Sequence, residues 1–136
     1  MRLYEEALQL QEEITQIRRT IHRHPEIGRK EFRTSKLIRE KLAELGVDEI
    51  QSPVPTAVIG LIHGGKGPGR CVALRADIDA LPVTEETGLP YSSEEPGMMH
   101  ACGHDMHVAM LLGTAKLLCR HREDFAGTVK LIFQHS

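Results

Sequence analysis

A short segment between positions 99 and 107, Met-His-Ala-Cys-Gly-His-Asp-Met-His, concentrates residue types that bind metals. Cysteine thiolate and histidine imidazole are the usual ligands of zinc and similar divalent ions. Cys102 and His104 can reach one ion only if the chain between them is kinked, which Gly103 permits. The segment leads into a predicted helix, whose N-terminus favours thiolate over thiol. The spacing therefore predicts a metal site with Cys102 and His104 as ligands.

The residues alone leave two other interpretations of this segment open. A single Cys-x-His pair is a weak pattern, because a closed structural zinc site needs four protein ligands. His100, Cys102, His104 and His107 could supply four, which would make the segment a local, non-catalytic zinc-binding module. The histidines could also cap the helix or bind loop carbonyls. We favour a site shared with other segments, because four ligands so close in sequence have awkward geometry.

Two aspartates follow directly from a predicted strand, at positions 77 and 79. Open α/β sheets place their active sites at the carboxyl ends of strands. A right-handed βαβ unit brings the end of its first strand and the start of its helix to the same edge. We therefore expect Asp77 and Asp79 near Cys102 and His104, either as ligands or as acceptors for a histidine N–H. Alternatively, the two carboxylates bind Arg75 or cap the loop.

Three helices are predicted to support these residues. The first follows a 4-3-4-3-4 spacing of apolar side chains and ends before Pro25; its apolar positions are Leu3, Ala7, Leu10, Ile14, Ile17 and Ile21. The second spans about 31–45, and Gly46 suits the left-handed position that follows it. The third spans about 105–121 and is expected to be largely buried, because it has little polar face.

The predicted strands lie at about 57–62, 71–75 and 128–133. A glycine-rich turn separates the first two, which predicts a hairpin. The second strand, the third helix and the last strand form a βαβ unit with a right-handed crossover. The long segment 81–102 has no regular pattern, and loops of this length are usually functional. Together these elements predict an α/β fold.

Composition narrows the function classes. The chain has 136 residues, enough for one compact domain, and a net charge of −2 with no basic block. We therefore expect neither nucleic acid nor membrane as a partner. The three cysteines are an odd number and the N-terminus does not resemble a signal peptide, so a cytoplasmic location is expected. Cys71 and Cys119 stand at apolar positions and are expected in the core.

Four stretches, in order and with similar spacing, resemble the metal-dependent amidohydrolases. This family includes aminoacylases, hippurate hydrolases, N-acyl-L-amino acid amidohydrolases and plant auxin-conjugate hydrolases. The matching stretches are residues 18–26, 75–82, 99–105 and 129–134. The resemblance implies a three-layer α/β/α fold with a central mixed sheet, as in zinc peptidases. Residues 1–136 would be the N-terminal part of the catalytic domain, and a lid or dimerisation domain is absent from them.

The resemblance also implies a site and a reaction. One or two divalent ions (Mn²⁺, Zn²⁺, Co²⁺ or Ni²⁺) would activate a water that cleaves the amide of a small N-acyl amino acid. A carboxylate base would take the proton of that water. Cys102 and His104 fall on ligand positions and Asp79 on the acidic residue that supports the site; His22 and His24 match positions interpreted as structural, and His100 and His107 are not expected to be ligands.

One departure from the family pattern affects the expected activity. The family continues after Phe-Gln with Pro-Ala-Glu-Glu, which supplies the general base and a further ligand, whereas this chain has His135 and Ser136. We expect the base glutamate beyond Ser136. The chain is then a fragment that is inactive alone, and the full-length protein is expected to be a homodimer. A dipeptidase or carboxypeptidase of the same fold is the alternative. Cys-Gly-His-Asp favours the amidohydrolases, because the peptidase branches typically carry His-x-Asp at the first site.

Overall fold

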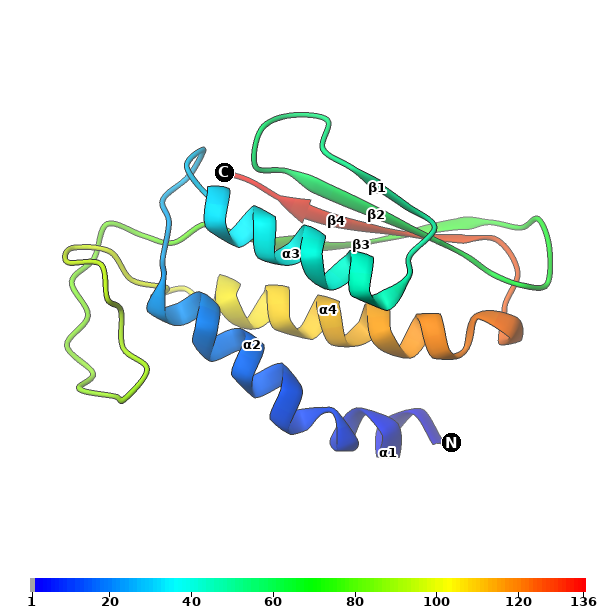
Figure 1. Cartoon of the computed structure of the whole chain (residues 1–136), viewed down its shortest axis with the longest axis horizontal. Coiled ribbons are helices and arrows are strands. Elements are labelled where there is room, and N and C mark those ends of the chain that lie inside the picture. The colour runs from blue at the N-terminus through cyan, green and yellow to red at the C-terminus, as the bar shows by residue number, and fades with distance from the viewer. Residues whose placement is uncertain (1) are drawn as a thin grey trace.

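The computed structural model describes residues 2–136 and contains a mixed sheet with helices packed on it (Figure 1). Within these residues the sheet has four strands in the order β1-β2-β4-β3. Their bounds are Glu49–Gln51 for β1, Val58–His63 for β2, Cys71–Asp77 for β3 and Thr128–Gln134 for β4. β2 runs antiparallel to both of its neighbours, whereas β3 and β4 are parallel. The predicted α/β class with a mixed sheet is confirmed.

The helices are α1 (Arg2–Gln9), α2 (Gln11–Arg23), α3 (Phe32–Leu45) and α4 (His104–Arg120), followed by a short 3-10 helix at Arg122–Asp124. α3 and α4 contact the sheet and each other, so they lie on the same face, and α2 packs against α4 (Figure 1). The described residues thus form two of the three expected layers. None of their helices is both long enough and apolar enough to cross a membrane.

The predicted first helix is two helices that meet at Leu10. Leu10, Ile17 and Ile21 are buried as the apolar spacing predicted, but α1 contributes no buried side chain. α2 approaches α4 closely at Gly113, where an added Cβ would lie 2.5 Å from Ile14 Cδ1. The predicted helix ends are confirmed, with α2 ending before Pro25 and Gly46 adopting a left-handed φ of 73° after α3.

The predicted hairpin between the first two strands is wrong, because β4 lies between β2 and β3. The glycine-rich connection does not form a tight turn but packs along the chain that enters β4. Gly64 N donates to Gly127 O at 2.8 Å, and Gly127 N donates to Gly67 O at 2.9 Å. A Cβ at Gly64 would collide with Phe125. These close backbone approaches place β4 beside β2 and leave β3 at the edge of the sheet.

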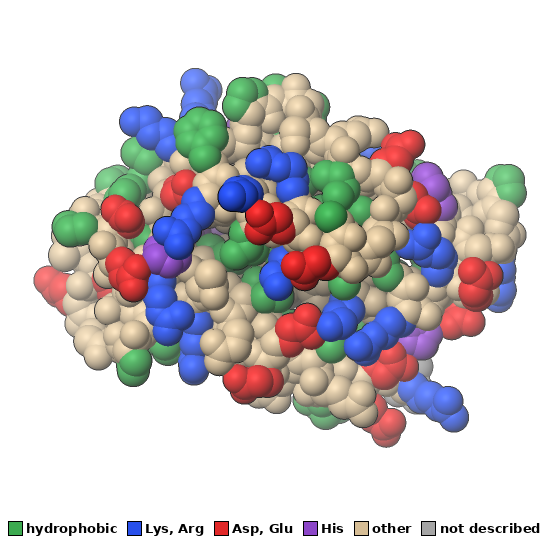
Figure 2. All heavy atoms as spheres, in the orientation of Figure 1, with side chains coloured by type: hydrophobic (Ala, Val, Ile, Leu, Met, Phe, Trp, Pro, Cys, Tyr) green, Lys and Arg blue, Asp and Glu red, His purple; other side chains and the backbone are tan. Residues whose placement is uncertain are grey.

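The core fills the space between the sheet and the helices α3 and α4. Its fully buried side chains include Ile38, Leu42, Val58, Ile62, Ile78, Val108, Leu131 and Phe133. The edge position of β3 explains why Cys71 is exposed rather than in the core as predicted; Cys119 is half-buried. Basic and acidic side chains alternate over the face in Figure 2 without a block of one sign.

Candidate metal centre

The site lies where the carboxyl end of β3 meets the first turn of α4. Asp77 ends β3, Asp79 follows two residues later, and His104 begins α4. The intervening loop is closed at its base by two hydrogen bonds, from Leu81 N to Met99 O at 2.9 Å and from Met99 N to Leu81 O at 3.0 Å. The β3-α4-β4 crossover therefore brings the aspartates and His104 together, as the sequence predicted.

His104 is held by one of its ring nitrogens. Its Nδ1 lies 2.9 Å from Asp79 Oδ1 and 3.0 Å from the Asp79 carbonyl oxygen. Both partners are acceptors, so Nδ1 is the donor in this contact. Nε2 lies 3.3 Å from Asp77 Oδ2. A histidine that a carboxylate orients through one ring nitrogen is the usual arrangement of a metal-binding imidazole. The contact between His104 and Asp79 is therefore suited to a histidine that binds a divalent ion.

The chain is kinked between the two candidate ligands. Gly103 has a φ of 109°, in the left-handed region that side chains with a Cβ disfavour, and it caps the N-terminus of α4. Cys102, on the other side of this glycine, is exposed. The glycine therefore has the conformational role that the sequence analysis gave it.

The other two histidines of the segment lie differently. The ring of His107 stacks on that of His104 with centroids 5.5 Å apart. His100 is 4% exposed, and its ring nitrogens have no hydrogen-bond partner within residues 2–136. Burial lowers the pKa of His100 to about 4, so the ring is neutral at neutral pH. Within the described residues, no three His, Cys, Asp or Glu side chains are grouped to hold an ion. These residues alone therefore assemble neither the shared metal centre nor the local four-ligand zinc site.

A buried network beside the site was not predicted. His22 is 2% exposed; its Nδ1 lies 2.7 Å from Asp105 Oδ2 and its Nε2 lies 2.9 Å from Glu85 Oε1. Arg18 Nε donates to the same Asp105 oxygen at 2.8 Å. The sequence motif indicated a structural role for His22 but did not indicate its partners. A fully buried acid such as Asp105 is rare unless it is paired. The burial of Asp105 could not be recognised from the sequence, because it depends on how the chain folds.

Glu85 is ionised within this network. Burial acts to raise the pKa of Glu85, but donors from the Thr87 hydroxyl, the Ser93 backbone N–H and His22 lower it overall. The Ser93 N–H lies 2.9 Å from Glu85 Oε1. Glu85 thus fixes both the loop that carries it and the ring of His22.

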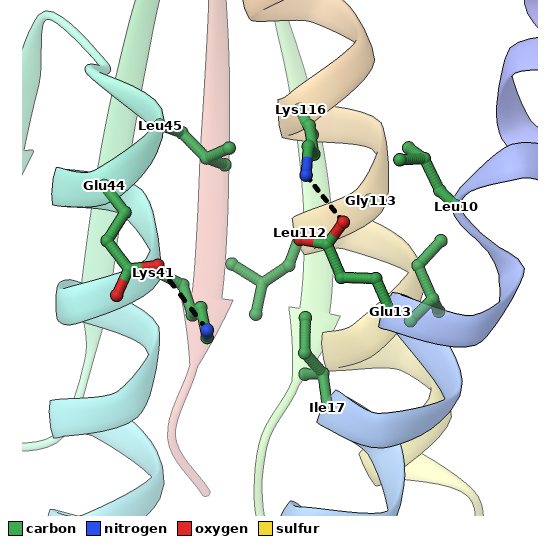
Figure 3. A pocket seen from close by; sticks show the side chains of 10 residues that line it. Leu10, Glu13, Ile17, Lys41, Glu44, Leu45, Leu112, Gly113 and Lys116 are labelled. Atoms are coloured by element: carbon green, nitrogen blue, oxygen red, sulfur yellow. Dashed lines mark hydrogen bonds and ion pairs between the residues drawn. The ribbon is translucent and has the colours of Figure 1, made fainter.

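The hollow in Figure 3 lies between helices α2, α3 and α4 and includes none of these site residues. Lys116 Nζ pairs with Glu13 Oε2 across it at 2.6 Å, above the apolar side chains of Ile17 and Leu112. The hollow is a gap in helix packing rather than part of the candidate centre.

Comparison with known proteins identifies close relatives. Residues 73–136 match the profile of peptidase family M20/M25/M40. The chain is 53% identical to thermostable carboxypeptidase 1 of Saccharolobus solfataricus, over 98% of this chain and 34% of that protein. It is 46% identical to an N-acyl-L-amino acid amidohydrolase of Geobacillus stearothermophilus, over 88% of this chain and 32% of that protein. The chain thus spans about a third of the length of these relatives.

A solved structure shares the fold. The crystal structure of the YXEP protein of Bacillus subtilis, a dinuclear metal binding peptidase from the M20 family, matches with a TM-score of 0.87 and 46% identity. The match covers 91% of this chain and 35% of that one. These matches confirm both the expected fold class and the resemblance to metal-dependent amidohydrolases.

Proposed function

Since this chain belongs to peptidase family M20/M25/M40, we propose that it carries part of the metal centre of a hydrolase that cleaves the amide bond of N-acyl amino acids. The observation that carries the proposal is the contact of His104 Nδ1 with Asp79, next to the Cys-Gly-His kink. Nε2 of the same oriented ring faces Asp77 Oδ2 at 3.3 Å and is the nitrogen that would bind an ion. The small-molecule substrate follows from the amidohydrolase relative.

In this proposal the residues of the chain have separate roles. Cys102 and His104 hold a divalent ion, either Mn²⁺, Zn²⁺, Co²⁺ or Ni²⁺, and Asp79 keeps the His104 ring in one orientation. A bound ion of this kind lowers the pKa of water and polarises a carbonyl. Further ligands and the general-base glutamate lie outside the described residues, beyond Ser136. Residues 1–136 belong to the catalytic domain. The whole protein also has a lid or dimerisation domain, and it forms a homodimer.

A carboxypeptidase is the second candidate, because the carboxypeptidase relative is 53% identical to this chain. Both reactions hydrolyse an amide and release an amino acid with a free carboxylate, so the metal chemistry is the same. They differ in the group on the acyl side, which is a small acid in one case and a peptide in the other. Hydrolysis of N-acetyl and N-benzoyl amino acids, compared with N-blocked dipeptides, discriminates between them in the protein that carries this chain.

Metal content tests the site. We expect the Cys102→Ala variant to lose bound Mn²⁺ or Zn²⁺ after dialysis, and the His107→Ala variant to keep it. Wild-type metal content in Cys102→Ala would contradict the proposed centre. A local structural zinc site predicts instead that both variants lose the metal and that chelation unfolds the chain.

A further inference from the structure

His22 joins three segments that are far apart in the sequence. It stands on α2, binds Glu85 in the long loop and binds Asp105 in the first turn of α4. The three side chains are almost completely buried, with exposed fractions of 3% for His22 and Glu85 and 0% for Asp105. The imidazole therefore forms a rigid connection between α2, the loop and α4, shielded from solvent.

Acidic and basic side chains meet in this connection. Each ring nitrogen of His22 lies within hydrogen-bond distance of a carboxylate oxygen, Nδ1 of Asp105 and Nε2 of Glu85. Arg18 Nε donates to the same Asp105 oxygen, so a guanidinium also faces this acid. Charge-assisted hydrogen bonds of this kind are short and strong, and removal of one buried partner leaves another charge uncompensated. The network therefore restricts how α2, the long loop and α4 can lie relative to one another.

The residues that His22 binds flank the candidate ligands along the chain. Asp105 directly follows His104, and Glu85 anchors the loop that returns to Cys102. α2 holds the same loop at a second point, where Glu94 N donates to Arg23 O at 2.8 Å. The Cys-Gly-His segment is thus tied on its α4 side and on its loop side to one imidazole.

We propose that His22 is a positioning residue of the metal centre, which holds Cys102 and His104 at the separation that one ion requires by clamping Glu85 and Asp105. The inference rests on the proposed function and adds a residue that would not touch metal or substrate. It predicts that replacement of His22 weakens metal binding in protein that is still folded. A purely structural His22 would instead affect the melting temperature alone.

The test compares four variants of the protein that carries this chain with the wild type and with Cys102→Ala. His22→Ala removes both contacts, whereas His22→Asn keeps a donor near the place of Nδ1 and hence the bond to Asp105. His121→Asn is the matched control, because His121 also binds two carboxylates, at the opposite end of α4. Leu42→Ala, at a fully buried position of α3, controls for lost stability. Affinity for Zn²⁺ is measured by competition with a chromophoric chelator, together with the melting temperature of the metal-free form.

We expect His22→Ala to weaken Zn²⁺ affinity by up to about tenfold, the lower limit for a direct partner of a metal ligand, because His22 acts on the ligands only through Glu85 and Asp105. His22→Asn should recover part of that loss, and it serves as the test if His22→Ala does not fold. His121→Asn and Leu42→Ala should bind as the wild type does. With an N-acetyl amino acid, kcat should fall in His22→Ala while KM stays within about twofold, because an ion held less firmly weakens the chemical step more than substrate binding.

Two results would overturn the inference, and they are distinguishable. If Cys102→Ala loses the metal but both His22 variants bind it no more weakly than Leu42→Ala, His22 is structural only and the proposed function stands. If the wild type binds Zn²⁺ no better than Cys102→Ala does, the metal centre itself is wrong, and the positioning role is lost with it.

Discussion

The two ends of α4 carry the same chemical motif in different surroundings. At the N-terminal end, His22 bonds to Asp105 and Glu85 with almost no exposure to solvent. At the C-terminal end, His121 bonds to Glu6 and Asp124, both at 2.9 Å, but its side chain is 31% exposed and that of Asp124 is 72% exposed. Two histidines with equal numbers of carboxylate partners thus differ mainly in burial.

The difference indicates which end of the helix is fixed. Exposed ion pairs are screened by solvent and contribute little to stability. A buried pair allows few alternative geometries, because any displacement leaves a charge without a partner. The buried motif lies at the end of α4 that carries His104, and the exposed motif lies at the end that enters the 3-10 helix. The end of α4 that is held more rigidly is therefore the end at the candidate metal centre.

Asp105→Ala should have the largest effect, because it removes the buried carboxylate that binds both the half-buried Arg18 guanidinium and the buried His22 ring. We expect a loss of about 3–5 kcal/mol in the free energy of unfolding, measured by urea denaturation. Asp124→Ala, at the exposed end, should lose only a small fraction of that amount. Equal losses in the two variants would show that burial does not distinguish the two ends.

Asp79→Asn should have the next largest effect, on metal affinity rather than on stability. The carboxylate orients the His104 ring, and loss of such an acceptor costs about 10–100-fold in metal affinity or activity. We expect about tenfold, the lower limit of that range, because the Asp79 carbonyl oxygen still accepts from Nδ1. Glu6→Gln makes the corresponding change at the other end of α4 and should leave Zn²⁺ affinity unchanged. Unaltered affinity in Asp79→Asn would remove the aspartate from the site.

Gly103→Ala is expected to cost about 1 kcal/mol in the free energy of unfolding, because its φ of 109° suits only glycine well. Gly46→Ala is a matched control, since Gly46 also has a left-handed φ, of 73°, at the end of α3. Both variants should lose similar stability in urea denaturation. Only Gly103→Ala should also weaken Zn²⁺ binding, and a similar loss of affinity in Gly46→Ala would contradict a local role for the kink.

The sequence predicted those features of the site that depend on local chemistry and handedness. The crossover rule placed Asp79 beside His104 although 25 residues separate them, because the rule does not depend on the path of the intervening loop. Gly46 and Pro25 marked helix ends for stereochemical reasons that act within a few residues. These inferences needed no knowledge of strand order.

The features that failed depend on partners distant in the sequence. The hairpin prediction paired neighbouring strands and did not foresee that β4 would enter between them, which also left Cys71 at the sheet edge. The bond of His22 to Glu85 depends on how the loop folds back onto α2, and no periodicity encodes that path. The three-residue strand β1 is too short to give a pattern. Long-range pairing, rather than composition, therefore limited the sequence prediction.

The smallest effect is expected from His121→Gln, and it should depend on pH. Hydrogen bonds to Glu6 and then Asp124 raise the pKa of His121 above its ordinary value. A histidine with a raised pKa in the folded state contributes stability that is fully present below the pKa of the unfolded state, about 6.5, and is lost as the pH rises through the folded value. The variant should therefore melt at a lower temperature than the wild type at pH 5.5 and at the same temperature at pH 9. An equal difference in melting temperature at both pH values would mean that His121 acts through packing rather than through its charge. The two ends of α4 would then not differ simply as a buried and an exposed charge cluster.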